Sequence, residues 1–427
     1  MALALLIAMP QGQWQGNGIN PEASGSPMST NHLAQRMETV QPNAIGELLK
    51  FGADPGLISF AGGYPDGSLF PLAQLNDVYQ TAILQNGAQS LQYTVSDGDP
   101  KLRAQLAARS TAKGTTCTSD NILILQGSQQ GLDLVAKMLV DPGDIIVTES
   151  PTFLGAIIAF KPCQPRYVGI PMDENGMKTE VLEQRLKEGL KPKLLYTIPD
   201  FQNPTGVTLS FERRKHLIAL ANQYDFMILE DTAYRELRYV GVEPATLKSL
   251  DTQDRVIMLG SLSKVLAPGL RLGWANGSVS MIQKLGLLKL AADTQCSTLN
   301  MAAASLYLER YNLDAHIETL RDAYQRKKNL MLETIRLHFP QEVSFTDPEG
   351  GLFTWLTFPN DFDSTRFMRD HVLSKAKVAY VPGSSFFPNA SELNHARFNF
   401  SGQTDANIVK GISALGTLLK LEMAKSS

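Results

Sequence analysis

One lysine in the chain stands in a setting that could change its chemistry. Lys264 lies in the segment Gly260-Ser-Leu-Ser-Lys264-Val-Leu-Ala-Pro-Gly-Leu-Arg271, directly after a predicted strand. Lost hydration and a nearby cation both lower the pKa of an amine, and a neutral amine can form a Schiff base with a carbonyl compound. For a lone lysine, a solvated place in a surface loop is the commoner arrangement. The neighbouring segments must therefore decide whether Lys264 is a reactive amine or an ordinary surface lysine.

Two turns after predicted strands carry further polar side chains. Asp200-Phe-Gln-Asn203-Pro-Thr-Gly206 is a turn by its Asn-Pro and Gly content, and its asparagine could donate to a phenolate oxygen or form a plain Asx turn. Asp231 and Tyr234 lie just past the carboxyl end of another strand, where ligands bind in α/β sheets. The aspartate could hold a protonated pyridine nitrogen, or it could cap a helix.

A third segment has residues that suit an anion. Gly127-Ser128-Gln129-Gln-Gly131 follows a predicted strand and opens a helix, so its backbone N–H groups and the helix dipole favour phosphate. A tight strand-to-helix turn needs similar residues, and both explanations stay open for this segment alone. Ser261, Ser263 and Arg271 are also residue types that surround phosphates.

The elements that must position these residues follow from the pattern of apolar runs. Short aliphatic runs bounded by turn residues or charges predict buried strands, and the helical stretches 132–140 and 211–224 lie between them. This alternation predicts a mostly parallel α/β sheet with helices on both faces. From about Ala302 a smaller α+β domain is expected, with a helix over 316–338, strands at 351–357 and 378–381, and a C-terminal helix. The strands predicted for the large sheet are 121–126, 144–148, 193–197, 225–230 and 255–259.

Composition excludes several classes of protein. The 427 residues are 43% hydrophobic and 19% charged with a net charge of -3, which fits a globular chain and neither a disordered nor a nucleic-acid-binding one. The three cysteines, Cys117, Cys163 and Cys296, are far apart, and the six histidines are scattered. This spacing argues against disulfides and a metal site, and it indicates a reducing compartment such as the cytoplasm.

The N-terminus calls for a separate interpretation. Residues 1–10 are apolar but too short to span a bilayer and lack a basic region, and residues 11–27 are Gly, Gln, Asn, Ser and Pro without periodicity. We expect a disordered leader over 1–27, or a true start at Met28, in preference to an unusual signal peptide.

Taken together, these segments resemble fold-type I, pyridoxal-phosphate-dependent class I/II aminotransferases, and within them the α-aminoadipate and kynurenine aminotransferase branch. The resemblance runs from about Asn31 to the C-terminus and is carried by SLSK, an arginine seven residues later, NPTG and the Asp-x-x-Tyr pair, in that family's order. It implies a large domain with a mostly parallel seven-stranded sheet flanked by helices, and a smaller α+β C-terminal domain. The expected division is an arm over 28–70 that joins the small domain, the large cofactor-binding domain over 71–300 and the small domain over 301–427.

The resemblance also assigns roles around the cofactor, pyridoxal 5'-phosphate. Lys264 would form the Schiff base and carry the proton shift, Asp231 would pair with the pyridinium nitrogen, and Asn203 and Tyr234 would bond the 3-oxygen. Tyr93 matches a tyrosine that reaches the phosphate of the neighbouring subunit, which implies a homodimer with shared active sites. The residues assigned to the phosphate are Ser128, Gln129, Ser261, Ser263 and Arg271.

Three other positions concern the ring and the substrate. Phe153 falls where members of the family have an aromatic residue, usually tyrosine, that stacks on the cofactor ring. A phenylalanine can stack in the same way, so its presence puts only a hydroxyl contact in doubt. Arg397 is assigned to the substrate α-carboxylate, since a guanidinium matches a carboxylate with two hydrogen bonds. Gly63 would let the backbone approach the substrate, while Tyr64 and a helix over 41–52 would shape the side-chain pocket.

Some residues are interpreted as structural. The run 213–215 (Arg-Arg-Lys) is expected on a solvated helix face, and Trp274 and Trp355 in packing. Cys296 is expected to be a buried structural cysteine.

The function expected from the resemblance is ping-pong transfer of an amino group from an aromatic or α-aminoadipate-like L-amino acid to a 2-oxo acid, with 2-oxoglutarate as the expected acceptor. A β-lyase or a racemase uses the same cofactor residues and stays open as an alternative. An amino-acid-sensing regulator is less favoured, because about thirty residues without basic character precede the matched region.

Overall fold

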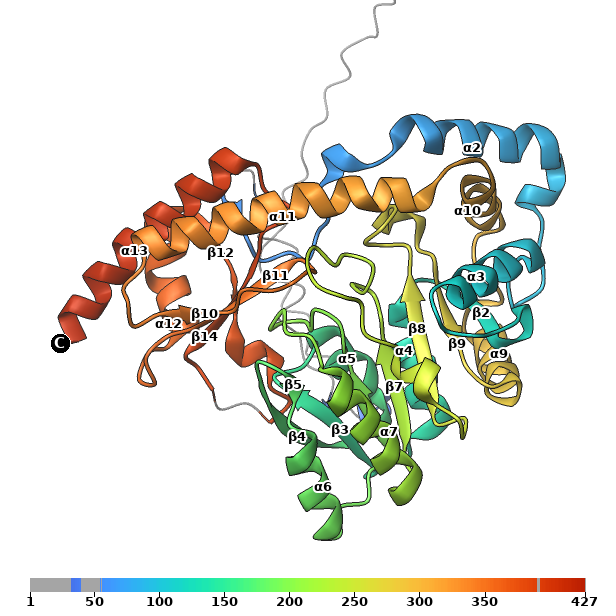
Figure 1. Cartoon of the computed structure of the whole chain (residues 1–427), viewed down its shortest axis with the longest axis horizontal. Coiled ribbons are helices and arrows are strands. Elements are labelled where there is room, and N and C mark those ends of the chain that lie inside the picture. The colour runs from blue at the N-terminus through green and yellow to red at the C-terminus, as the bar shows by residue number, and fades with distance from the viewer. Residues whose placement is uncertain (1–31, 40–53, 55, 390–391, 427) are drawn as a thin grey trace, which may run out of the picture.

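The computed structural model describes residues 32–39, 54, 56–389 and 392–426. Within these residues it confirms the expected α/β architecture (Figure 1). The leader predicted for residues 1–27, the alternative start at Met28 and the helix predicted for 41–52 lie outside the described residues.

The large sheet has eight strands in the described chain, in the order β2-β9-β8-β7-β6-β3-β4-β5. Neighbouring strands from β8 to β4 run parallel, while β9 is antiparallel to both β2 and β8. Seven strands were expected, and the two-residue β5 adds an eighth at the edge. The strands are β2 (Ile122–Leu125), β3 (Ile145–Ser150), β4 (Arg166–Asp173), β5 (Gly176–Met177), β6 (Leu194–Thr197), β7 (Met227–Asp231), β8 (Val256–Ser261) and β9 (Gly273–Asn276).

Alternate side chains of these strands enter two separate apolar cores, because successive residues of a strand point to opposite faces. Ile146 and Leu229 belong to one core, whereas their neighbours Val147 and Ile228 belong to the other. Helices therefore cover both faces of the sheet, as expected. The first core receives α4 (Ser128–Leu139) and α5 (Leu154–Phe160), and the second receives α6 (Thr179–Lys187), α7 (Phe211–Tyr224) and α8 (Leu247–Leu250).

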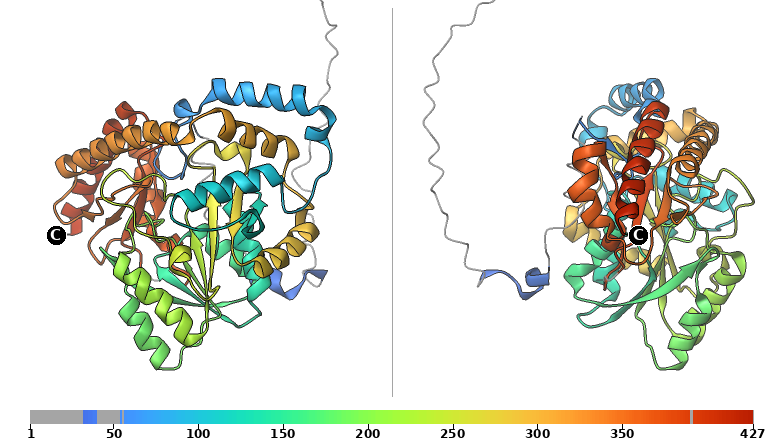
Figure 2. Two further views of the ribbon diagram at one scale, coloured as in Figure 1. Left: turned by 45° about the vertical axis from the view of Figure 1, so that its right-hand side comes forward. Right: turned by 90° about the vertical axis from the view of Figure 1, so that its left-hand side faces the viewer.

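Four further helices surround the β2 end of the sheet (Figure 2). α10 packs against α2 and α3, while α9 packs against α4 and β2. The expected packing roles of Trp274, which is 8% exposed, and of Cys296, which is fully buried, are confirmed in this region. The helices are α2 (Leu72–Asn86), α3 (Pro100–Ala112), α9 (Val279–Asp293) and α10 (Thr298–Arg310).

A second, four-stranded antiparallel sheet lies in the C-terminal part, in the order β10-β11-β14-β13. The long helix α11 runs alongside α13, and both lie over this sheet (Figure 1). Its elements are α11 (Leu313–His338), β10 (Ser344–Phe345), β11 (Phe353–Thr357), α12 (Ser364–Phe367) continued by a π-helix (Met368–Ala376), β13 (Val381–Pro382), β14 (His395–Asn399) and α13 (Asp405–Ser426).

The strand predicted over 378–381 is divided into two. β12 (Val378–Ala379) pairs in parallel with β1 (Ile58–Ser59), whereas β13 pairs with β14. The buried ring of Tyr380 stands between them, so the chain changes partner strand at this residue. This change attaches the N-terminal segment at β1 to the C-terminal part of the fold.

The prediction that 213–215 form a solvated helix face is wrong for two of the three residues. The α7 helix has the predicted bounds, but Arg214 is fully buried and pairs with Asp200 at 2.7 Å. Arg213 binds Asp173 and the carbonyl of Gly176. A buried acid that contacts the helix reverses the usual preference of arginine for solvent, and such an acid cannot be seen in the local sequence.

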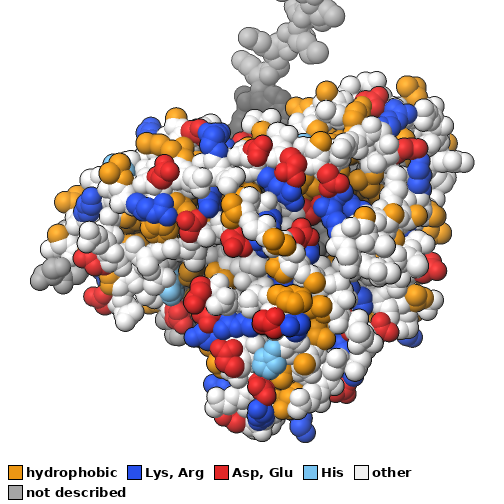
Figure 3. All heavy atoms as spheres, viewed as in Figure 1, with side chains coloured by type: hydrophobic (Ala, Val, Ile, Leu, Met, Phe, Trp, Pro, Cys, Tyr) orange, Lys and Arg blue, Asp and Glu red, His pale blue; other side chains and the backbone are white. Residues whose placement is uncertain are grey.

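Positive and negative side chains are interspersed over the face shown in Figure 3, in keeping with the small net charge. Within the described residues, no helix is both long and apolar enough to cross a membrane, and no group of three or more potential metal ligands occurs.

Candidate active site

Three adjacent strands bring the predicted polar residues to one edge of the large sheet. The Asn203 turn follows β6, Asp231 is the last residue of β7, and Lys264 lies in the turn after β8. Since β6, β7 and β8 are neighbouring parallel strands, their carboxyl ends meet at this edge. The residues therefore converge although more than sixty positions separate the first from the last.

Lys264 is held by the N-terminal segment. Its Nζ atom donates a hydrogen bond to the carbonyl oxygen of Gly63 at 2.7 Å. Burial, with the positive charges of Arg397 and Arg271, lowers the pKa of Lys264 from 10.5 to about 8, against the opposing effect of Asp231. A substantial fraction of the amine is therefore neutral near physiological pH, as a nucleophile requires.

Asp231 is a buried carboxylate, 3% exposed, at the end of β7. It accepts hydrogen bonds from the Tyr196 hydroxyl and the Ala233 backbone N–H, both at 3.2 Å, and it forms no ion pair with a described residue. Burial raises its pKa from 3.8 to about 6. A cation placed against this carboxylate would relieve the cost of burying its charge.

Asn203 connects two of the predicted residues. Its Nδ2 donates to the Tyr234 hydroxyl at 3.1 Å, and its Oδ1 accepts from Arg397 Nη1 at 2.8 Å. All three residues are at least 94% buried, and burial raises the pKa of Tyr234 to about 12. The Asn203 amide thus fixes the positions of a phenol and a guanidinium.

Arg397 lies on β14 and forms no ion pair with a described residue. Its Nη2 donates to the Ala61 carbonyl at 2.6 Å, its Nε has no hydrogen-bond partner, and its guanidinium lies over the rings of Phe353 and Phe386 at 4.3 and 5.1 Å. Burial lowers the pKa of Arg397 to about 10. A buried guanidinium that holds only neutral acceptors is suited to an anionic ligand such as a carboxylate.

The residues predicted around an anion meet where β2, β8 and β9 lie side by side. Gly273 pairs with both Leu125 and Ser261, so the start of α4 lies beside the end of β8. Ser261 Oγ accepts from the Ser263 N–H at 3.1 Å, and Ser128 opens α4. The first turn of a helix, two serines and a nearby arginine form a corner rich in hydrogen-bond donors.

Gly127 and Arg271 are in close contact in this corner. Gly127 has φ +75°, and a Cβ at this residue would lie 2.7 Å from Arg271 Nη2. Arg271 itself has φ +52° and donates from Nη2 to the Gln126 carbonyl at 3.0 Å. Glycine is required here both by the backbone conformation and by the approach of the guanidinium.

Phe153 and Gln129 are neighbours on the other side of the α4 N-terminus. Gln129 Nε2 donates to the Gly155 carbonyl at 2.8 Å. A Cβ on Gly155 would lie 2.4 Å from the Phe153 ring, so this glycine makes room for the ring. Phe153 is half-buried and not sealed in a core, which leaves part of the ring free to stack on a ligand.

Two predicted residues have exposed side chains in the single chain. Tyr93 is 82% exposed, and Tyr64 is 45% exposed. The side chain of Tyr93 is therefore largely open to solvent in the single chain.

Sequence reasoning did not identify the carboxylate of Glu149 or the amide of Gln202. Glu149 is 1% exposed and accepts from Gln202 Nε2 at 3.0 Å beneath the Asn203 turn. Tyr196, which donates to Asp231, was also missed. The only signal was an acid next to the Pro151 turn, and such an acid is unremarkable without the fold.

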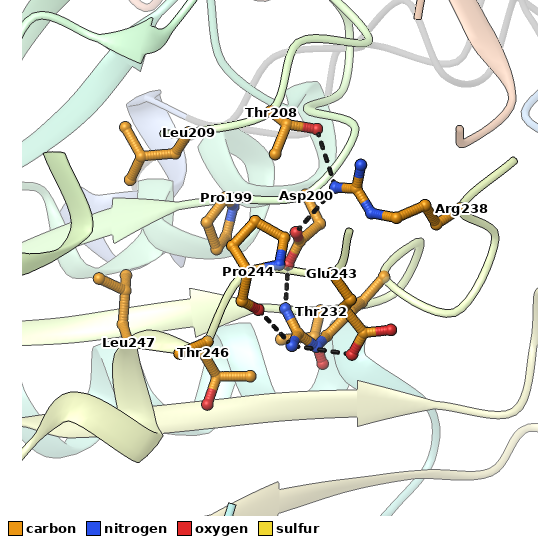
Figure 4. Close-up of polar contacts among 12 residues, drawn as sticks. Pro199, Asp200, Thr208, Leu209, Thr232, Arg238, Glu243, Pro244, Thr246 and Leu247 are labelled. Carbon is orange, nitrogen blue, oxygen red and sulfur yellow. Dashed lines mark hydrogen bonds and ion pairs between the residues drawn. The ribbon is translucent and has the colours of Figure 1, made fainter. Parts of the chain in front are cut away.

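Asp200 was named only as the first residue of the turn, yet it anchors an arginine cluster (Figure 4). It binds Arg214 at 2.7 Å and Arg235 at 2.8 Å, and Arg238 lies 3.8 Å away. Burial would raise the pKa of Asp200, but Arg214 and Arg235 hold it below 3.8. Arg235 also binds Glu243 and the Pro244 carbonyl, and Arg238 donates to Thr208 Oγ1. The cluster therefore fixes the start of the Asn203 turn.

A cavity of about 850 Å³ opens next to this site, behind the Asn203 turn. Thr205, Gly206, Trp355 and His395 are among its lining residues, and none of the predicted site residues lines it. Trp355 packs against Phe386 and His395, as expected of a packing residue. The convergence of polar groups, and not the cavity volume, therefore locates the candidate site.

Comparisons with known proteins agree with this geometry. Residues 60–415 match the family model "Aminotransferase class I and II". The chain is 40% identical over 399 residues to aromatic-amino-acid aminotransferase 1 of Thermococcus litoralis, covering 92% of this chain and 95% of the relative. It is 36% identical over 387 residues to 2-aminoadipate transaminase of Thermus thermophilus, covering 89% and 94%. The crystal structure of Pyrococcus horikoshii kynurenine aminotransferase superposes with a TM-score of 0.88 at 38% identity, covering 92% and 98%.

Proposed function

Since the chain belongs to the class I and II aminotransferase family, it is a pyridoxal-phosphate-dependent aminotransferase, and we propose that it takes its amino group from an aromatic or α-aminoadipate-like L-amino acid. The names of the relatives support this donor class, because aromatic amino acids, 2-aminoadipate and kynurenine all occur in them. The proposed acceptor is a 2-oxo acid, 2-oxoglutarate first.

The residues present fit pyridoxal 5'-phosphate. The buried Asp231 lacks a cationic partner among the described residues, the Lys264 amine has a lowered pKa, and the corner at Gly127 and Arg271 offers donors to a phosphate. We assign the ring nitrogen to Asp231, the 3-oxygen to Asn203 and Tyr234, and a ring face to Phe153. The phosphate is assigned to Ser128, Gln129, Ser261, Ser263 and Arg271, with Tyr93 from a second chain.

When bound, the cofactor supplies a carbonyl group and an electron-withdrawing ring. The side chains of the protein do the rest. Lys264 moves a proton as general acid and base, because a pKa of about 8 lets its amine hold and release one near neutral pH. Arg397 binds and orients the substrate carboxylate, and Gly63 lets the backbone come close. Asp231 supplies the negative charge that keeps the ring nitrogen protonated.

The proposed assembly is a homodimer with shared active sites, located in the cytoplasm. Support comes from Tyr93, 82% exposed, and from Leu91 and Leu84 nearby, which are 72% and 82% exposed. Apolar surface of this kind marks protein interfaces. A second chain would cover these side chains and deliver Tyr93 to a phosphate.

The proposed domain division is 28–70 for the arm, 71–300 for the large domain and 301–427 for the small one. It is supported by the large sheet, which falls within 122–276, and by the second sheet, which falls within 344–399. The β1–β12 pair supports an arm that belongs with the small domain.

The deciding experiment is an absorbance spectrum of the purified protein with bound cofactor, before and after single L-amino acids are added without an oxo acid. We expect a visible band that disappears with aromatic or aminoadipate-like donors and returns with 2-oxoglutarate. Lys264→Ala should abolish the band, and the exposed control Lys284→Ala should not. Release of ammonia would favour a lyase, and formation of the D-isomer a racemase. An unchanged band with every amino acid would contradict transamination.

A further inference from the structure

Glu149 lies beneath the active site without touching a predicted reacting group. It is on β3, and three donors converge on its carboxylate. Thr197 Oγ1 donates to Oε1 at 2.5 Å, while Ile198 N and Gln202 Nε2 donate to Oε2 at 3.3 and 3.0 Å. A carboxylate can satisfy all three because it offers only acceptors.

The contact with Glu149 fixes which way the Gln202 amide points. Gln202 Nε2 also donates to the Pro151 carbonyl at 2.9 Å. On its other side, Gln202 Oε1 accepts from Thr205 N at 2.9 Å and from Thr205 Oγ1 at 2.7 Å. A flipped amide would set its NH2 group against the Thr205 N–H, so only one orientation satisfies every partner.

Asn203 lies inside the turn that this amide closes. Gln202 also accepts from Gly206 N at 2.6 Å through its backbone carbonyl, so side chain and main chain of one residue span the whole turn. The Asn203 amide, in turn, must point Nδ2 at Tyr234 and Oδ1 at Arg397. A shift of the turn would displace both contacts together.

We propose that Glu149 is a positioning residue of the transamination site: through Gln202 and the turn, its carboxylate fixes the Asn203 amide against Tyr234 and Arg397. The proposal rests on the proposed function, since it assigns Asn203 to the 3-oxygen of the cofactor. Catalysis itself stays with the residues that touch the reacting groups.

Burying the carboxylate of Glu149 costs the fold free energy, because its charged form loses hydration. Burial, together with the negative charge of Asp231, raises the pKa of Glu149 from 4.5 to about 7. A glutamine would avoid buried charge, but it would present an NH2 group to at least one of the three donors. Of these two side chains, only the carboxylate can accept from all three donors.

The first test compares Glu149→Gln with the matched control Glu230→Gln. Glu230 is fully buried on β7 and accepts from the Leu247 and Lys248 N–H groups at 2.8 Å, away from the turn. We expect Glu149→Gln to lower kcat/KM roughly 10- to 100-fold and to shift the pH midpoint of the bound-cofactor absorbance change. Glu230→Gln should lower only the melting temperature. Equal behaviour of the two variants would overturn the proposal.

The second test is a double-mutant cycle with Asn203→Ala. If Glu149 acts through Asn203, Glu149→Gln should change kcat/KM and the spectral midpoint less than about twofold in the Asn203→Ala background. Additive effects of the two substitutions on kcat/KM would contradict an action of Glu149 through Asn203. Should Glu149→Gln fail to fold, Thr205→Val removes one 2.7 Å bond to the same amide and should shift the midpoint in the same direction.

The spectral midpoint also separates this proposal from the proposed function. A wild-type protein that binds the cofactor but converts no amino acid would refute the function, and the midpoint of Glu149→Gln would still decide the role of Glu149. A wild-type protein without a cofactor band would refute both.

Discussion

At the scale of single residues, two ionisable groups of the site have pKa values displaced toward neutrality. Burial lowers the pKa of Lys264 to about 8 and raises that of Asp231 to about 6. Both groups can therefore change charge within about one unit of neutral pH. The ionisation of each group can be tested without measuring enzymatic turnover.

The first prediction concerns the amine of Lys264 in the cofactor-free protein. Because only the neutral amine reacts, its modification by a small aldehyde with borohydride trapping should rise with pH to a midpoint near 8, not near 10.5. Peptide mass spectrometry gives the rate at this residue. Arg397→Met removes a nearby positive charge and should move the midpoint upward. A midpoint near 10.5 in the wild type would contradict the lowered pKa.

The second prediction concerns Asp231→Asn. A rise of the pKa from 3.8 to about 6 means that the charged carboxylate costs the cofactor-free fold roughly 3 kcal/mol above pH 6, and this cost declines as pH falls from 6 toward 3.8. The variant should therefore melt at a higher temperature than the wild type at pH 8, with a smaller difference at pH 5. Its transaminase activity should fall at least about 100-fold, because the charge partner of the ring is lost. A lower melting temperature at pH 8 would refute this account.

Residue types and spacing were enough to nominate Lys264, Asp231 and Asn203, because each lies at the end of a strand or in the turn after it, within a short motif. Their functional roles remain predictions. The motif could not show Glu149, whose proposed positioning role depends on donors on β6 and in the following turn. Arg214 was misjudged for a similar reason, since its partner Asp200 lies outside the helix, 14 positions earlier.

At the scale of elements, the site depends on turns whose positions are fixed by neighbouring contacts and by their own backbone conformation. The corner at Gly127 depends on a left-handed backbone, and the Asn203 turn depends on the Asp200 cluster. Each support can be removed separately.

The third prediction compares Gly127→Ala with Gly114→Ala. Both glycines have positive φ, so both variants should lose about 1–2 kcal/mol of stability. A Cβ at Gly127 would also meet Arg271 at 2.7 Å, whereas nothing lies within 4 Å at Gly114. We expect only Gly127→Ala to weaken cofactor binding, about tenfold or more, as measured by spectral titration. Equal affinities would show that the corner does not hold the phosphate.

The fourth prediction concerns the arginine cluster. Asp200→Asn leaves Arg214, fully buried, without its charge partner and should lower the free energy of unfolding by about 3–5 kcal/mol in urea titrations. Asp173→Asn disrupts a more exposed pair with Arg213 and should cost about 1 kcal/mol or less. Similar losses in both variants would mean that Asp200 is not a buried anchor.

Apolar runs located the central strands to within about two residues because those strands are buried on both faces. β4 and β9 were not predicted. β4 is a partly exposed strand that contains Pro171, and β9 has only four residues and starts with Gly273. A strand with a weak apolar pattern or a short length cannot be recognised from its sequence alone.

At the scale of the whole molecule, Tyr93 differs from the other proposed site residues, because its side chain is 82% exposed in the described chain. The dimer therefore remains a prediction that rests on an exposed tyrosine. Only the family resemblance at Tyr93 pointed to an interface between copies, because the partner surface belongs to another chain and leaves no local pattern of its own in the sequence.

The fifth prediction is complementation between two defective chains. Lys264→Ala and Tyr93→Ala should each lose cofactor binding or activity, but a mixed dimer contains one site with both residues intact. Co-refolded chains should regain up to about a quarter of wild-type activity, since half of random dimers are mixed and each has one intact site. A mixture that equals the average of the two variants would refute shared sites.

The segment near β1 also constrains when the enzyme can become complete. Arg397 Nη2 binds the Ala61 carbonyl 336 positions earlier in the chain, and β1 pairs with β12. A ribosome that adds about 5–20 residues per second needs on the order of 20–70 s to produce that partner. The segment around Ala61 must therefore wait until residue 397 has been added before this contact can form. Until then Arg397, which we propose to bind the substrate carboxylate, is missing, so a nascent chain cannot yet present a finished site.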